Sequence, residues 1–333
     1  MDRRLTSENR LPHRNHTMGT DNIEEAFLQQ AYDSLKAADL DAASDILDRA
    51  LGSNWEHAEV RYALKCVNWW KEREKKLADI SENSERGDFY LAQWGPFLSF
   101  LDRLGHSCDR CIYAVRHYVF ASALACFTAV QAKGGDQRDP GLLVQLGRCN
   151  KWTGNYEQAL KHLEEALRLG KDDAACLAEL ADVNALINEV RVAKALFREA
   201  FFLDPRSTDL RYMESDMIRL LAQRVQTLGW QSPELEEWIP VFGTIWHVFN
   251  VKRELRAIEV GRLKQSIFTL ENEVRLHSDK AGTLVPRLIN RYFWLIDHYV
   301  NTGEDRARIQ ETLLKIKLLD EGIYKQYTGS VMD

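Results

Sequence analysis

The chain of 333 residues is poor in the features that break helices or build strands. It has only 7 prolines and 18 glycines, few enough to allow long helices, and period-two alternation of Val, Ile and Thr is scarce. It has no run of 18 apolar residues, and its first twenty residues lack the apolar stretch of a signal peptide. We therefore expect an all-helical protein without a transmembrane helix.

Signatures of catalysis are also missing. There is no HExxH motif for zinc and no GxSxG motif for a nucleophilic serine. Gly134 and Gly135 form a glycine pair, but no Lys-Ser or Lys-Thr ending follows them, as a phosphate-binding loop would require. We predict that the protein is not an enzyme, with no catalytic residues, no cofactor and no metal.

The charge balance limits the class of partner. The formal net charge is −6, and the 44 basic and 50 acidic residues are interspersed along the chain. A nucleic-acid-binding protein usually carries a basic patch, so we expect neither a nucleic-acid nor a membrane partner. The six cysteines mostly stand where a helix needs small apolar residues, which suits reduced thiols and a cytoplasmic location.

Cys108 and Cys111 are the most enzyme-like feature, because two thiols three residues apart share one face of a helix. Redox motifs of this spacing follow a strand, and no strand is expected here. His117 lies nine residues after Cys108, on the opposite face of a straight helix, so the same helix cannot complete a metal site. We expect both thiols to pack in the helix, with a dithiol redox role as the alternative.

Residues 142–205 superpose on themselves with a shift of 34 positions. Large and small apolar residues recur in the same places: Leu146, Ala159, Leu163, Ala166 and Leu169 become Leu180, Ala193, Phe197, Ala200 and Leu203. The two stretches should therefore build the same helix–turn–helix unit. A unit of this length cannot bury its apolar face alone, so it must stack on neighbours.

These two units resemble the tetratricopeptide repeat family. Leu146-Gly147 resembles its leucine followed by a small residue, 154–156 resembles its turn, and Asp204-Pro205 its ending. Asn150 and Lys171 depart from the pattern, since the family usually has an aromatic residue and a proline there. The resemblance implies a right-handed superhelix of helix–turn–helix repeats, a solenoid, with an irregular helical C-terminal region. Looser matches are Ala43, Leu47, Ala50 and Leu51 near one end, and Tyr299 and Gly303 near the other.

The pattern along the chain predicts a disordered arm at 1–19, the repeat array at 20–226, a C-terminal helical region with a degenerate repeat at 227–328, and a frayed tail at 329–333. The segment 133–140 is the clearest break in the first half. Four local expectations concern helices: one long helix over 55–80, an interruption near Gly95-Pro96, a turn near His117, and an apolar helix over 208–226.

In the tetratricopeptide family, the first helices of successive units line a concave groove that binds peptides or protein segments. The resemblance places these residues of the present chain in such a groove: Val144, Arg148, Lys151, Ala178, Asp182, Tyr212 and Asp216. The family's clamp for a peptide carboxylate is missing, and Asp182 and Asp216 favour a basic or mixed ligand. We predict a non-enzymatic scaffold that binds a protein or peptide, and a homo-oligomer is left open.

The nine tryptophans leave a second function open. Most of them lie outside the regular repeats, where they either fill the core or form a binding face. Trp69 and Trp70 point about 100° apart on a helix, so both cannot lie deep in one core layer. The alternative to a scaffold is a small-molecule-binding or enzymatic protein with its site in the tryptophan-rich C-terminal half.

Overall fold

The computed structural model describes residues 17–134, 139–170, 173–251, 254–303 and 306–332. Every regular element in these residues is a helix, which confirms the all-α prediction. The chain divides into two compact units, 1–134 and 135–333. The boundary falls within the segment 133–140, which the sequence marks as a linker.

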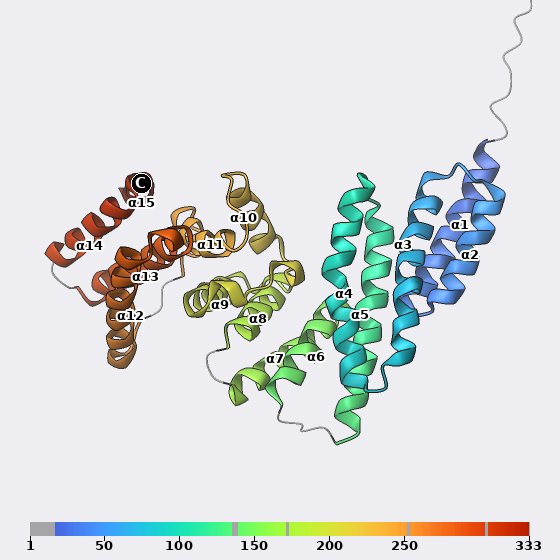
Figure 1. Ribbon diagram of the computed structural model, residues 1–333, viewed down its shortest axis with the longest axis horizontal. Helices are drawn as coiled ribbons and strands as arrows, with labels where there is room; N and C mark the ends of the chain where they lie inside the picture. The colour runs from blue at the N-terminus through green and yellow to red at the C-terminus, as the bar shows by residue number, and fades with distance from the viewer. Residues whose placement is uncertain (1–16, 135–138, 171–172, 252–253, 304–305, 333) are drawn as a thin grey trace, which may run out of the picture. The chain divides into compact units, whose positions relative to one another are not determined.

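Unit 1 is a set of long helices around α5 (Figure 1). Helices α1 and α2 form an antiparallel pair, α4 lies along α5, and α5 also packs on α1 and α3. The bounds are α1 Thr17–Lys36, α2 Leu40–Ser53, α3 Ala58–Glu74, the 3₁₀ turn η1 Lys75–Asp79, α4 Asn83–Leu104 and α5 Asp109–Ala132. Of the predicted disordered arm, residues 1–16 lie outside the described residues, and 17–19 already belong to α1.

Three local predictions for unit 1 are wrong. The helix expected over 55–80 ends at Glu74 and continues only as a 3₁₀ turn. Helix α4 runs through Pro96, and α5 runs past His117 without a turn. A proline inside a helix removes one hydrogen bond, but burial of the flanking Trp94 and Phe97 holds α4 in place. Trp94 meets Phe120 of α5 with ring centres 5.4 Å apart.

Helix α5 alone is long and apolar enough, by composition, to cross a membrane among the described helices. A core helix of a globular unit passes the same test. Here α5 packs on α1, α3 and α4, and its apolar side chains Val115, Val119 and Phe120 are fully buried. Its hydrophobicity is therefore explained by its place in the core of unit 1.

Unit 2 begins with two antiparallel helix pairs and continues into a less regular region (Figure 1). Helix α6 pairs with α7 and α8 with α9, and α7 and α8 join the pairs. The helices are α6 Pro140–Trp152, α7 Tyr156–Leu169, α8 Ala174–Leu186, α9 Val190–Leu203, α10 Asp216–Gln226, α11 Glu234–Ile245, α12 Ala257–Leu276, α13 Ala281–Thr302, α14 Arg306–Leu319 and α15 Glu321–Met332. The 3₁₀ turns are η2 Pro205–Ser207, η3 Leu210–Tyr212 and η4 Ser278–Lys280.

The 34-residue repeat is realised in the two helix pairs. Leu146 and Leu180 are buried at equivalent places, as are Leu163 and Phe197, whereas Leu169 is exposed. Each first helix starts after an aspartate cap, Asp139 or Asp173, which are also 34 residues apart. Asn150 and Asn184 each donate from Nδ2 to the carbonyl oxygen four residues earlier, at 2.8 Å in both helices. The departure at Asn150 is thus shared by both units.

Close approach within the first pair depends on Gly147. A Cβ added there would lie 2.5 Å from Cγ of Leu163 on α7, so no larger residue fits without movement. Ala181, the equivalent residue of the second pair, is fully buried. A small residue at this position lets the two helices of a pair cross closely.

One turn geometry occurs in three helix pairs. Ala38, Gly154 and Asn188 have positive φ angles of 61°, 83° and 66°, each two residues before the second helix begins. The residue after each of them donates its amide to the carbonyl five residues back, at 2.8 to 2.9 Å. This is the Schellman ending of a helix. The α1–α2 pair of unit 1 therefore ends its first helix as the two regular repeats do.

The regular helix pairs end before Pro205, although the repeat array was expected to continue to 226. The helix predicted over 208–226 begins only at Asp216, and the two 3₁₀ turns η2 and η3 precede it. Farther on, α15 continues to Met332, where a frayed tail was expected from 329.

Candidate functional site

The structure brings four of the predicted groove residues, Arg148, Lys151, Asp182 and Tyr212, into one cluster. Lys151 of α6 is fully buried, and its Nζ lies 2.7 Å from carboxylate oxygens of both Glu179 and Asp182 on α8. Nε of Arg148 donates to Oε1 of Glu179 at 2.5 Å. Two cations and two carboxylates therefore balance in a site that is almost entirely buried, with only Arg148 partly exposed.

The spacing of these ion pairs follows from the repeat. Arg148 precedes Glu179 by 31 residues, and Lys151 precedes Asp182 by 31. In helices that repeat every 34 residues and lie side by side, residue i lies near residue i+34. It also lies near residue i+31, which is about one helical turn before i+34. The cluster thus joins the first helices of successive units.

The same side chains hold a segment of the chain itself, residues 210–215. Nζ of Lys151 donates to the carbonyl oxygen of Tyr212 at 2.7 Å. The carboxylate of Asp182 accepts the amides of Glu214 at 2.8 Å and Ser215 at 2.9 Å. These contacts place the irregular segment where the first turns of a third repeat helix would begin.

Tyr212 is also held through its side chain. The guanidinium carbon of Arg148 lies 4.1 Å from the centre of the Tyr212 ring, within the range of a cation–π contact. Three residues that the sequence assigns to a ligand groove thus bind an internal segment.

The electrostatics of the cluster favour its charged form. Burial lowers the pKa of Lys151, but the attraction of Asp182 and Glu179 raises it by more, so the pKa lies above its ordinary value. The pKa of Arg148 is raised for the same reason, with Glu179 outweighing burial. Removing one charge would leave the opposite charge buried without its partner.

The three remaining predicted residues lie apart from the cluster. Val144 is half-buried against the core of the α6–α9 pairs, and Ala178 is fully buried. Asp216, the first residue of α10, is exposed and borders an open hollow of about 370 Å³. Most of the surface of this hollow is apolar. It is contributed by Met217, Leu220, Leu221, Trp246 and Val248, and the polar residues around it are Lys194, Asp216, Arg224 and His247.

Two residues of the hollow, Leu220 and Trp246, have no place in the groove predicted from the sequence. Leu220 is 61% exposed, high for a leucine on a helix that packs against a neighbour. The guanidinium of Arg224 lies 3.9 Å from the Trp246 ring, which fixes both side chains at the rim. The aromatic run 238–249 carries a signal for such a surface, but periodicity alone does not separate its exposed members from its buried ones.

The tryptophans divide between core and surface. Trp70 is fully buried and its neighbour Trp69 is half-buried, as their angular separation on a helix requires. Among the other described tryptophans, buried rings include Trp94, Trp152, Trp238 and Trp294, partly exposed rings are Trp230 and Trp246, and Trp55 is 69% exposed.

The thiols of Cys108 and Cys111 are poorly suited to nucleophilic chemistry. Burial raises the pKa of Cys108, and its Sγ donates to Glu59 at 3.2 Å. A hydrogen bond with Cys66, together with burial, raises the pKa of Cys111, which is fully buried. Because the thiolate is the reactive form, these shifts favour the packing interpretation. Within the described residues, no three His, Cys, Asp or Glu side chains are grouped to hold a metal.

Comparison with known proteins adds no family. No protein-family model matches the chain, and no curated protein is significantly similar to it.

Proposed function

We propose that the protein is a non-enzymatic scaffold of the tetratricopeptide type, a right-handed helical solenoid that binds a protein or peptide segment. The observation that carries this proposal is the apolar hollow beside α10, with the exposed Leu220 at its edge. Exposed apolar side chains next to a fixed Arg–Trp pair are typical of binding hot spots.

The position of the hollow supports the same function. Asp216 follows Asp182 by 34 residues, a spacing that favours α10 as the next in the row of first helices that line the groove in the tetratricopeptide family. The earlier part of that row is already occupied by residues 210–215. The surface open to a partner is therefore the α10 hollow rather than the Arg148–Asp182 cluster.

The side chains of the hollow define the partner's chemistry. Arg224 is stacked on Trp246, and Nζ of Lys194 contacts Asn250 at 3.3 Å, so both cations already have neighbours. Asp216 is highly exposed and has only a loose contact with Arg219, 3.7 Å away. A segment with an apolar anchor and a nearby lysine or arginine fits this arrangement.

Selection from a random peptide library displayed on phage tests the proposal. We expect the intact protein to enrich peptides that combine an apolar residue with a basic residue. Leu220→Asp should abolish their binding, and Asp216→Lys should weaken it. Leu318→Asp is the matched control, because Leu318 is 80% exposed on α14, away from the hollow. Failure to enrich any such peptide, or equal loss in the Leu318 variant, would contradict the proposal.

Self-association and a cytoplasmic location belong to the same proposal. The open end of a repeat array can pair with a second copy, which size-exclusion chromatography with light scattering would detect. Fluorescence microscopy of the tagged full chain would test the location. We propose neither a nucleic-acid nor a membrane partner.

A further inference from the structure

Three arginines of unit 2 differ in whether their N–H groups have a carboxylate partner. Arg198 is buried with its carboxylate partner Asp297, and Arg287 makes two hydrogen bonds to the buried carboxylate of Glu237. Arg291 lies one turn after Arg287 on α13. Its Nε and Nη1 atoms are buried and have no hydrogen-bond partner among the described residues.

Arg291 nevertheless remains a cation at neutral pH. Burial and the neighbouring charge of Arg287 lower its pKa to about 10, which is still well above 7. The guanidinium carbon lies 3.8 Å from the centre of the Phe202 ring, so a cation–π contact offsets part of the cost of burial. A ring face cannot accept the in-plane N–H groups as a carboxylate can.

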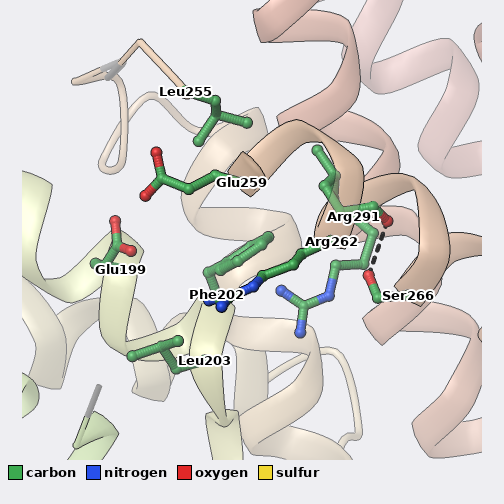
Figure 2. A pocket seen from close by; sticks show the side chains of 9 residues that line it. Glu199, Phe202, Leu203, Leu255, Glu259, Arg262, Ser266 and Arg291 are labelled. Carbon is green, nitrogen blue, oxygen red and sulfur yellow. Dashed lines mark hydrogen bonds between the residues drawn. The ribbon is translucent and has the colours of Figure 1, made fainter. Parts of the chain in front are cut away.

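Arg291 borders a cavity of about 190 Å³ between α9, α12 and α13 (Figure 2). An apolar cavity of about 150 Å³ is large enough for benzene, so this one suits a slightly larger molecule. The side chains around it are Glu199, Phe202 and Leu203 of α9, Leu255, Glu259, Arg262, Leu263 and Ser266 on or next to α12, and Arg291.

Charges of both signs border the cavity. In Figure 2 the carboxylates of Glu199 and Glu259 lie to one side of Phe202 and the guanidinium of Arg291 to the other, while the side chain of Arg262 runs toward Phe202. Glu259 is fixed at the start of α12, where it accepts the amide of Arg256 at 2.8 Å and pairs with the Arg256 guanidinium at 3.2 Å. The cavity is bordered by two carboxylates and two arginines, so a ligand with both charges matches it better than a multiply charged anion.

We infer that this cavity binds a small zwitterion of the amino-acid class. Its carboxylate pairs with Arg291, its ammonium group faces Glu199 and Glu259, and a short apolar side chain lies among Leu255, Leu263 and Phe202. The ligand supplies Arg291 with the hydrogen-bond acceptor that Asp297 supplies to Arg198 and Glu237 supplies to Arg287.

Calorimetric titration of the full chain with valine, leucine, isoleucine, methionine and phenylalanine, one at a time, tests the inference. We expect saturable binding of at least one of them. Leucinamide lacks the carboxylate and 4-methylpentanoate lacks the ammonium group, and each should bind roughly thirtyfold more weakly than leucine if leucine is a ligand. The corresponding amide and deaminated acid serve for any other amino acid that binds.

Two methionine variants separate binding from folding. Arg291→Met should abolish binding and raise the melting temperature of the ligand-free protein, because it removes a cation whose buried Nε and Nη1 atoms have no hydrogen-bond acceptor. Arg287→Met is the matched control and should lower the melting temperature, since it leaves the buried carboxylate of Glu237 with only the longer contact to Arg206, 3.7 Å away. Glu199→Gln, in a residue that is only partly buried, should weaken amino-acid binding while leaving 4-methylpentanoate binding unchanged.

The inference is overturned by any of three results. These are no binding of any of the five amino acids, unchanged binding by the folded Arg291→Met protein, or equally tight binding of the deaminated acid. Leu220→Asp should leave amino-acid binding intact, which distinguishes this cavity from the hollow at α10.

Discussion

The ammonium group of Lys151 lies 2.7 Å from the carboxylate of Asp182, and both side chains are fully buried. The pair joins α6 to α8, and both residues also bind the backbone of residues 212–215. A position predicted to face a ligand is therefore part of the internal support of the repeat.

Replacement of Lys151 should be strongly destabilising. Lys151→Met leaves Asp182 buried without a cation and Glu179 with Arg148 alone, which should lower the free energy of unfolding by about 3–5 kcal/mol. Lys75→Met is the control, because Lys75 pairs with Glu72 on the surface and should change stability by about 0.5 kcal/mol or less. Chemical denaturation followed by circular dichroism measures both. Equal effects of the two variants would show that the buried cluster does not support the fold.

The shared turn geometry predicts opposite effects of two substitutions. Ala38 and Gly154 both have positive φ angles, a conformation that costs an alanine roughly 1 kcal/mol relative to glycine. Ala38→Gly should therefore stabilise the protein, and Gly154→Ala should destabilise it, each by about 1 kcal/mol. Thermal unfolding of the two variants decides the matter, and shifts of the same sign would be inconsistent with a common turn.

Unit 1 should lose stability in acid partly through Glu59. Burial raises the pKa of Glu59, but hydrogen bonds from Tyr32, Cys108 and Arg110 lower it by more, so it lies below the ordinary value of 4.5. The folded form thus binds its proton less readily than the unfolded form. The stabilisation is present above pH 4.5 and is lost as the pH falls through the folded-state pKa.

Melting temperatures measured between pH 3 and pH 6 test the direction of this pKa shift. The wild-type protein should lose more stability on acidification than Glu59→Gln, which cannot titrate at this position. A larger acid loss in the glutamine variant would contradict the assignment.

The helix pairs could be predicted because their information is local. Apolar residues such as Leu163 and Phe197 recur at helical spacing and at the same place in each repeat, so both the helices and their buried faces follow from the sequence. The caps Asp139 and Asp173 carry the same 34-residue signal.

Continuity of a helix was harder to predict. Pro96 reads as an interruption in a single sequence, yet the contacts of Trp94 and Phe97 carry α4 through it. Packing between distant segments decided this case, and local propensity could not reveal it.

The burial of the predicted groove residues depends on structure that the repeat pattern does not contain. The pairing of Lys151 with Asp182 follows once the helices are known to lie side by side. The repeat pattern does not predict that residues 210–215 cover this pair. That covering requires α10 to begin at Asp216, eight residues after the start predicted at 208.

Hydrogen exchange of the protein with and without a selected peptide tests the central claim most directly. We predict new amide protection confined to residues 216–224 and 246–248, with exchange of residues 210–215 unchanged. Loss of protection at 210–215 would contradict the account, because it would mean that the peptide displaces the internal segment and binds at Lys151 and Asp182.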